Sequence, residues 1–339
     1  MIITIKEIAR LANVSTGTVD RIIHKRGQVA QENIDKVNAI IKEHDYKRNV
    51  FASNLAFNKR FVFAVFLPKY DTIEYWRAQV QGIEKAEEEY RNFGVILEYH
   101  LYDFDSISFK EKAKEVLKST YDGILFTPTF HKESIDFLNK CELKNVPIVM
   151  VDSNIETKVQ HTYIGQDAFK SGVLAGKLIS LVVKEEHQVL IVKITREIEA
   201  TSVYLQRIAG FYSFFENNNN LNHFKFKEVT IKDSGEELLT IDMFATIQSV
   251  FVPNSRAYLV ANFLEKNNII GIRIIGYDLL DLNKEYLKKG MIEFLINQKP
   301  EIQGFTAIAS LYKQLVLQEF VLETQYMPLE IIVKENLQM

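Results

Sequence analysis

Residues 4–23 read TIKEIARLANVSTGTVDRII, and their apolar positions fall at helical spacing on both sides of a short break. This spacing predicts a first helix from residue 5 that turns one face into a core, with the side chains of Ile5, Ile8, Leu11 and Ala12. The pattern breaks at residues 13–14, and Ser15 is of a type that caps helix N-termini. We therefore expect a second helix over residues 16–23, with its inward side chains at Val19, Ile22 and Ile23.

A third helix is predicted from about Gln31 to His44, burying Ile34, Val37, Ile40 and Ile41. Two short helices joined by a tight turn and supported by a third form a helix-turn-helix, whose second helix enters the major groove of DNA. The pattern alone leaves one alternative, a three-helix cap without a DNA role.

Positive charge is concentrated in this part of the chain. Residues 1–60 hold eleven Lys and Arg against six Asp and Glu, a net charge of +5, whereas the remaining residues hold 30 basic and 38 acidic residues, a net charge of −8. A module that faces DNA phosphates needs such an excess of positive charge. Residues 46–60 continue it as a basic and polar connector.

From Phe61 onward, apolar strand-like runs alternate with amphipathic helical segments. Continuous apolar runs such as VPIVMV at residues 146–151 predict strands buried on both faces, and the alternation predicts parallel βαβ units. A second series of the same kind begins near residue 188 and reaches Asp278. The sequence thus predicts an α/β protein with a helix-turn-helix head and a body of two lobes with parallel sheets.

The expected boundaries are residues 1–47 for the head, 48–60 for a hinge or linker, and 61–339 for the body. Within the body, lobe 1 is expected at about 61–183 and 298–322, and lobe 2 at about 184–297 and 323–339. We expect a cytoplasmic protein, because no export signal and no apolar run of about 18 residues is present. Cys141 is the single cysteine and the histidines are scattered, so neither a disulfide nor a metal site is expected.

Enzymatic motifs are also absent from the sequence. Residues 271–276, GIRIIG, lack the third glycine of a dinucleotide loop, and there is no serine elbow or phosphate loop. The acid pair Asp103 and Asp105 is expected in a solvated loop. We therefore predict that the chain is not an enzyme and needs no cofactor.

With these motifs in view, the chain resembles the lac repressor (LacI/GalR) family over essentially its whole length. Residues 4–23 match the family's head signature nearly position for position, and residues 49–56, NVFASNLA, are similar to its hinge helix. The body resembles the family's periplasmic-binding-protein-like core at residues 163–167, 206–211, 275–278 and 328–336. The sequence departs from the family pattern at Asp20, Arg48 and Ser53, where the family usually has Ser, Pro and Arg.

The resemblance implies which residues contact DNA. Thr16 and Gly17 occupy base-reading positions, with Arg21 on the same helix, and Leu55 takes the place of the leucine that wedges between base steps in the minor groove. The full set implied to lie at the DNA is Thr4, Ser15, Thr16, Gly17, Thr18, Arg21, Asn49, Ala52 and Leu55.

The ligand is expected between the lobes, at the carboxyl ends of parallel strands. Asp152, Asp167 and Asp278 each follow an apolar run and suit the hydroxyls of a polyol, and Tyr75 and Trp76 suit stacking on a sugar ring. The resemblance implies that Arg207 is the ligand-contacting arginine. Its guanidinium can bind two hydroxyls or an acid group, so the ligand could be a sugar or a sugar acid. The remaining candidates are Asn254 and Gln298.

The resemblance implies a repressor of carbohydrate-utilisation genes, controlled by a sugar-like effector. It is expected to bind a pseudo-palindromic double-stranded operator as a homodimer, because one head contacts too few bases. No membrane is expected among its partners. Three alternatives stay open: a nucleobase effector, a protein co-effector, and a small-molecule receptor without a DNA role.

Overall fold

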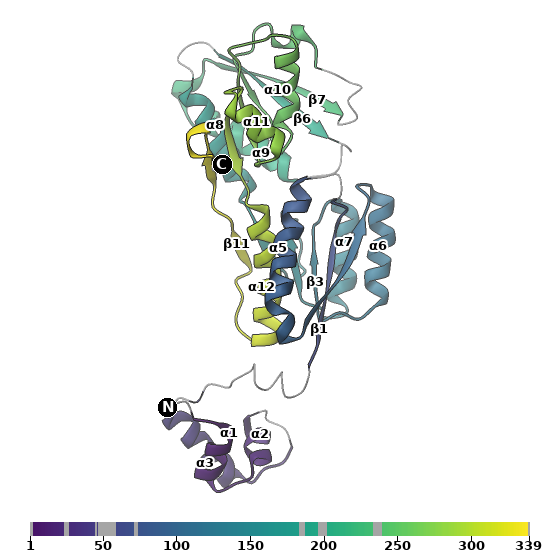
Figure 1. The fold of residues 1–339 in the computed structure, drawn as a ribbon, viewed down its shortest axis with the longest axis vertical. Helices are drawn as coiled ribbons and strands as arrows, with labels where there is room; N and C mark the ends of the chain where they lie inside the picture. Colours follow the sequence, from purple (N-terminus) through teal and green to yellow (C-terminus); the bar gives the residue numbers. More distant parts are fainter. Residues whose placement is uncertain are drawn as a thin grey trace. The chain divides into compact units, whose positions relative to one another are not determined.

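A computed structural model describes residues 3–23, 27–44, 46, 59–70, 74–182, 187–195, 202–232 and 239–337 (Figure 1). The chain divides into two compact units, Met1–Phe57 and Asn58–Met339. Within the described ranges, no helix is long and apolar enough to cross a membrane.

The first unit is a three-helix head made of α1 (Ile5–Ala12), α2 (Thr16–Ile23) and α3 (Gln31–Glu43). The predicted helices are confirmed to within one residue. Ile8, Val19 and Val37 are fully buried at the centre, one from each helix. Leu11 was expected in this core, but its side chain is 47% exposed because it faces away from the other helices.

The second unit contains two six-stranded sheets of equivalent strand order, which differ in the direction of one edge strand. The first has the order β11-β5-β4-β3-β1-β2, from strands Thr324–Tyr326, Thr162–Gly165, Ile148–Val151, Gly123–Phe126, Phe61–Pro68 and Val95–Tyr102. The second has the order β12-β10-β9-β8-β6-β7, from strands Glu330–Ile332, Ile292–Asn297, Arg273–Tyr277, Ser249–Phe251, His187–Thr195 and Phe224–Lys232. All pairs are parallel except β10–β12, so the predicted parallel sheets are confirmed.

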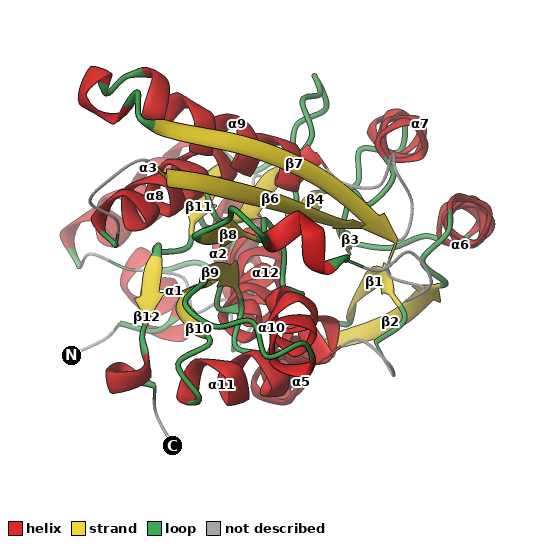
Figure 2. Ribbon diagram, turned by 90° about the horizontal axis from the view of Figure 1, so that it is seen from above, coloured by secondary structure: helices red, strands yellow, loops and turns green. Residues whose placement is uncertain are grey.

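Each sheet is covered by helices on both faces, which is why its strands are apolar on both faces (Figure 2). In lobe 1, α5 (Glu74–Tyr90) and α12 (Pro300–Tyr312) cover one face, and α6 (Ser106–Lys118) and α7 (His131–Glu142) cover the other. In lobe 2, α8 (Ala168–Leu181) and α9 (Ser202–Glu216) lie opposite α10 (Ala257–Lys266) and α11 (Asp281–Lys288). The short helical segments are Arg91–Phe93, Asn219–Leu221, Ile241–Phe244, Lys313–Leu317 and Lys334–Asn336.

The chain crosses between the lobes at other points than the sequence predicted. The helix α8 packs on α9 in the core of lobe 2, so the first crossing lies between β5 and α8 and not near residue 183. Strand β11 pairs with β5 in lobe 1, so the last crossing follows residue 326 and not 322. The expected boundaries were wrong because a continuous βα pattern does not reveal the lobe to which a helix returns.

The two lobes repeat the same close helix contact. In lobe 1, a Cβ on Gly82 of α5 would lie 1.8 Å from the carbonyl oxygen of Glu301, at the start of α12. In lobe 2, a Cβ on Gly210 of α9 would lie 2.0 Å from the carbonyl oxygen of Phe169, at the start of α8. Each helix pair is therefore held at backbone contact and behaves as one body.

We predict that Gly82→Ala lowers the free energy of unfolding by about 1–3 kcal/mol, because α5 and α12 must separate to admit a methyl group. Urea denaturation followed by the fluorescence of Trp76, on α5, measures this change. Gly17→Ala is the control: the nearest atom to its added Cβ is 3.8 Å away, so the same substitution meets no steric barrier. Equal stability of Gly82→Ala and wild type would contradict the helix-contact argument.

Candidate functional site

The helix-turn-helix presents the first turn of α2 to solvent. Ser15 caps α2, since the backbone N–H of Thr18 donates to its Oγ at 3.0 Å, as predicted. Asn13 ends α1 in the left-handed conformation, with φ 53°, which makes the tight turn between the helices. Thr16, Gly17 and Arg21 are exposed, whereas Val19 anchors the opposite face of the helix in the core. This is the exposure that a groove-reading helix requires.

Of the other residues implied to contact DNA, Thr4 and Thr18 make hydrogen bonds within the head. Thr18 is half-buried, and its hydroxyl bonds to Ser15 Oγ. Thr4 caps α1 in a reciprocal contact with Glu7, so its exposed side chain also has a structural role. Three members of the set, Asn49, Ala52 and Leu55, lie outside the described residues, as do the departures at residues 48 and 53.

In the body, two aspartates occupy equivalent positions in the two lobes. Asp152 follows β4 with φ 68°, and Asp278 follows β9 with φ 66°. Each backbone N–H donates at 3.1 Å to a carbonyl of the next strand, Ile164 and Ile296 respectively. The left-handed turn at the carboxyl end of the strand thereby directs an aspartate away from each sheet, and Asn/Asp tolerate it better than most residue types.

Arg207 of α9 is joined to Asp278 through Gln298. The guanidinium donates from Nη2 to Gln298 Oε1 at 2.5 Å, and Gln298 Nε2 donates to Asp278 Oδ2 at 2.8 Å. A second bond runs from Arg207 Nη1 to the carbonyl oxygen of Pro253, and the guanidinium lies 3.8 Å from the ring centre of Tyr277. We call Arg207, Gln298 and Asp278 the polar bridge.

The polar bridge keeps two groups without a hydrogen-bond partner among the described residues. These are Arg207 Nε and Asp278 Oδ1, and both are buried. A buried donor and a buried acceptor left open are costly unless another molecule satisfies them. The bridge therefore offers a donor and an acceptor to a small polar ligand.

Lobe 1 contributes Tyr75 and Asp152. The Tyr75 hydroxyl donates to Asp152 Oδ1, and the Ser153 hydroxyl donates to Oδ2 at 3.1 Å. Trp76 meets Tyr75 edge to face, with ring centres 5.3 Å apart, and both rings are buried. Burial, followed by the negative charges of Asp152 and Asp278, raises the pKa of Tyr75 well above its usual value. The Tyr75 hydroxyl therefore stays protonated and serves as a donor.

The charges of the site are not balanced one to one. Burial raises the pKa of Asp278 to about 7, although Arg207 and the bond from Gln298 oppose this shift. Burial also raises the pKa of Asp152, against the bond from Tyr75 and the attraction of Arg207. Two carboxyl groups face one guanidinium, so one of the carboxyls readily holds a proton near neutral pH.

The polar bridge together with Tyr75, Trp76 and Asp152 is called the polar cluster. Two other predicted ligand residues make structural hydrogen bonds and do not belong to it. Asp167 caps α8, because it accepts from the backbone N–H of Lys170 at 2.9 Å. Asn254 holds the turn after β8: its Nδ2 donates to the carbonyl oxygen of Ile194 at 2.6 Å, and its Oδ1 accepts from the N–H of Arg256 at 3.1 Å. The other candidates, Tyr75, Trp76, Asp152, Arg207, Asp278 and Gln298, are brought together.

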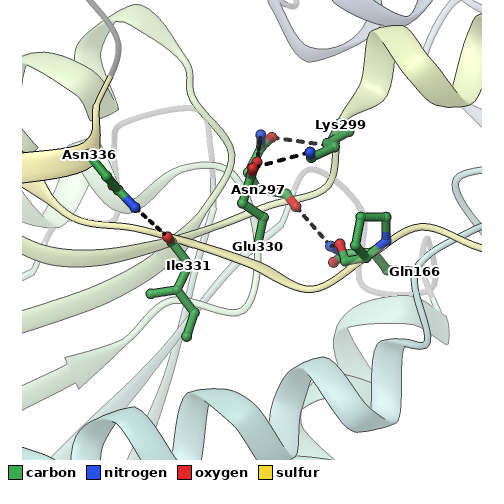
Figure 3. Close-up of polar contacts among 7 residues, drawn as sticks. Gln166, Asn297, Lys299, Glu330, Ile331 and Asn336 are labelled. Atoms are coloured by element: carbon green, nitrogen blue, oxygen red, sulfur yellow. Dashed lines mark hydrogen bonds and ion pairs between the residues drawn. The ribbon is translucent and has the colours of Figure 1, made fainter.

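The residue that joins the crossings by hydrogen bonds was not among the residues predicted from the sequence. Gln166, buried after β5, donates from Nε2 to the carbonyl oxygens of Asn297 at 2.8 Å and Pro328 at 3.0 Å (Figure 3). One amide thus holds all three segments that pass between the lobes. Next to it, Glu330 accepts from Asn297 Nδ2 at 2.8 Å and pairs with Lys299 Nζ at 3.1 Å. Gln166 follows β5 and Gln298 follows β10, which are equivalent strands of the two sheets. This repeat is the sequence feature from which Gln166 could have been predicted.

A pocket of about 820 Å³ opens beside the cluster. Its walls come from both lobes and from the crossings: Tyr75 of α5 and Asp278 belong both to this pocket and to the cluster. Within the ranges that the structure describes, no three His, Cys, Asp or Glu side chains are grouped so that they could hold a metal ion. The geometry therefore suits an organic ligand with several hydroxyls.

Two family models match the chain, one for each unit. Residues 4–49 match the model of bacterial regulatory proteins of the lacI family, and residues 63–319 match a periplasmic binding protein domain. Among curated proteins, catabolite control protein A of Staphylococcus xylosus is 32% identical over 155 residues. That alignment covers 45% of this chain and 45% of the relative, so the chain spans less than half of the length of the curated relatives it matches.

Solved structures share the fold of the second unit. A LacI transcriptional regulator from Bacteroides fragilis is 27% identical, with a TM-score of 0.75 over 82% of this chain and 98% of that chain. A solute binding protein from Bacillus halodurans with bound myo-inositol is 18% identical, with a TM-score of 0.72 over 82% and 96% of the two chains. The chain therefore belongs to the periplasmic binding protein domain family through residues 63–319, and its head, residues 4–49, matches the model of bacterial regulatory proteins of the lacI family.

Proposed function

We propose that this protein is a sequence-specific repressor of carbohydrate-utilisation genes, whose affinity for its operator is controlled by a small sugar-like effector bound between the lobes. The observation that carries the proposal is the polar bridge, which joins α9, the end of β9 and a crossing segment in a chain whose first residues match the lacI family model. The curated relative carries the name catabolite control protein A, which agrees with this role. A DNA-binding role also places the protein in the cytoplasm.

The effector is best matched by a neutral polyhydroxylated molecule. Arg207 Nε and the Tyr75 hydroxyl are donors, whereas Asp152 and Asp278 are acceptors when ionised and one can donate when protonated. An anionic ligand would meet two carboxyl groups against one guanidinium, which disfavours a sugar acid relative to a sugar or polyol. Tyr75 and Trp76 supply the aromatic face on which a sugar ring packs.

At the DNA, we propose that α2 reads bases through Thr16 and Arg21 and that Leu55 acts as the minor-groove wedge. Two heads on a pseudo-palindromic operator imply a homodimer. A ligand changes operator affinity only through its different affinity for the two lobe arrangements, typically by about 1–3 kcal/mol. Operator titrations with and without the ligand give the direction of this coupling.

A base-reading Arg21 makes a prediction about specificity. Arg21→Ala should lower affinity for a duplex selected from a random library by roughly 5- to 150-fold more than affinity for random competitor, because a bidentate base contact is lost. The matched control is Lys42→Ala on α3, which removes the same charge from another exposed position and should weaken both duplexes alike. Binding assays at one salt concentration measure both affinities. If Arg21→Ala weakened binding to the selected duplex and to random competitor by the same factor, the base-reading role would be contradicted.

A ligand screen tests the effector site. Monosaccharides, polyols, sugar acids and nucleobases should be compared by thermal shift, since a ligand at 100 times its Kd stabilises the folded state by about 2.7 kcal/mol. We expect a neutral sugar or polyol to raise the Tm of wild type and of Asp167→Asn, whose carboxylate caps α8, but not of Asp152→Asn. A response to nucleobases alone, or to no small molecule, would favour the nucleobase or the protein co-effector instead.

The buried Asp278 predicts a pH dependence of stability. Its pKa of about 7 in the folded protein exceeds the ordinary value of 3.8, so the folded state binds the proton more tightly than the unfolded chain. The stabilisation from this proton is complete below pH 4 and is lost as pH rises through 7, by about 1.4 kcal/mol per unit of pKa difference. Asp278→Asn should abolish this contribution, so the stability difference between wild type and variant should change steadily from pH 4 to 8. A constant difference in urea denaturation across that range would refute the raised pKa.

A further inference from the structure

Helix α11 begins without a cap of its own. It runs from Asp281 to Lys288, and the residue before it, Leu280, has no side-chain oxygen to accept from the first turn. The first N–H groups of a helix have no partner within the helix, so an uncapped start is unfavourable. Within α11, Asp281 instead pairs with Lys284 at 2.6 Å.

The missing cap comes from the other lobe. Glu74, the first residue of α5, accepts from the backbone N–H of Asp281 through Oε1 at 2.8 Å. The hydrogen bond from Asp281 and the helix dipole favour the carboxylate, whereas burial, and to a smaller extent the charge of Asp281, raise the pKa of Glu74 above its ordinary value. Lobe 1 thus caps a helix of lobe 2.

Both ends of this contact are fixed to the effector site. Glu74 precedes Tyr75, which donates to Asp152, and α5 is held at backbone contact with α12. On the other side, α11 starts three residues after Asp278. Asn283 of α11 donates from Nδ2 to the carbonyl oxygens of Tyr277 at 3.0 Å and Asp278 at 3.1 Å, so the helix moves with the end of β9.

We propose that Glu74 is an interlobe latch: its cap on α11 stabilises the arrangement of the lobes seen here and thereby sets how readily the effector site closes. The inference rests on the proposed function at one point: it takes closure of the lobes to be the change by which the effector alters operator affinity. The contact requires α5 and α11 to be at this distance, because an opened cleft removes the carboxylate from the Asp281 N–H. We call this arrangement closed and one in which α5 and α11 are apart open, and the latch stabilises the first relative to the second.

The closed fraction can be measured without DNA or effector. Spin labels at cysteines introduced at Glu111 of α6 and Lys266 of α10, both exposed, report the distance between the lobes. Cys141 is buried and its pKa is raised to about 12 by burial, so labelling is confined to the introduced positions. Loss of an N-cap changes an equilibrium by roughly 2- to 30-fold, so Glu74→Ala should lower the closed-to-open ratio by that factor.

Three variants separate a latch from a simple structural cap. Glu74→Gln keeps an oxygen acceptor and should give an intermediate ratio, whereas Glu88→Ala, at an exposed position of the same helix, should match wild type. In Glu74→Ala, the added change Leu280→Ser gives α11 a cap of its own. A latch predicts that amide-exchange protection of α11 returns while the lobes stay open.

Two results would overturn the proposal. One is an unchanged distance distribution in Glu74→Ala, and the other is recovery of the closed distance by Leu280→Ser. Neither result bears on operator binding or on the ligand screen, so the latch can fail while the proposed function stands. Conversely, a protein that binds no DNA would still show the change in lobe distance if the latch is present.

Discussion

The body of this protein is organised around one constraint: Arg207 is almost completely buried and needs acceptors that its own helix does not provide. A buried charge without partners costs several kcal/mol. The carbonyl oxygen of Pro253, the ring of Tyr277 and the amide of Gln298 meet this need, and they come from three different segments of the chain. Gln298 lies on a crossing between the lobes, so satisfying the arginine also fixes one hinge segment relative to lobe 2.

The same constraint explains why the bridge contains an amide and not a direct ion pair. Gln298 donates to Asp278 and accepts from Arg207, which lets Asp278 keep one oxygen free. A direct bidentate pair would use both carboxylate oxygens and the fork of the guanidinium. The bridge thus leaves one donor and one acceptor for a ligand while both charged groups remain partly satisfied. A ligand that completes these bonds removes a cost that the folded protein already carries.

Sequence reasoning succeeded where local contacts decide the structure. The three head helices are specified by apolar spacing within 40 residues, with side-chain caps at the first two, and the parallel strands by runs of apolar side chains. It failed where distant segments decide: the lobe that receives α8 and the exposure of Leu11 depend on partners that periodicity does not identify. In the site, Asp152 and Asp278 were predictable from their place after a strand, but Asp167 has the same local pattern and caps a helix. An aspartate after a strand can cap a helix or join a polar cluster, and only the tertiary fold separates the two.

Gln166 and Glu74 extend this reasoning to motion. Gln166 joins the other two crossings through one amide, so a movement that keeps these bonds must carry all three crossings together. Bonds within the hinge that are kept in two arrangements of the lobes favour neither of them. The contacts that distinguish open from closed must then lie away from it, between α5 and α11 and across the polar cluster. Under the proposed function, a ligand that bonds to Tyr75 and Asp278 would connect α5 with the segment that leads into α11, and its binding would favour the arrangement in which these two elements are close.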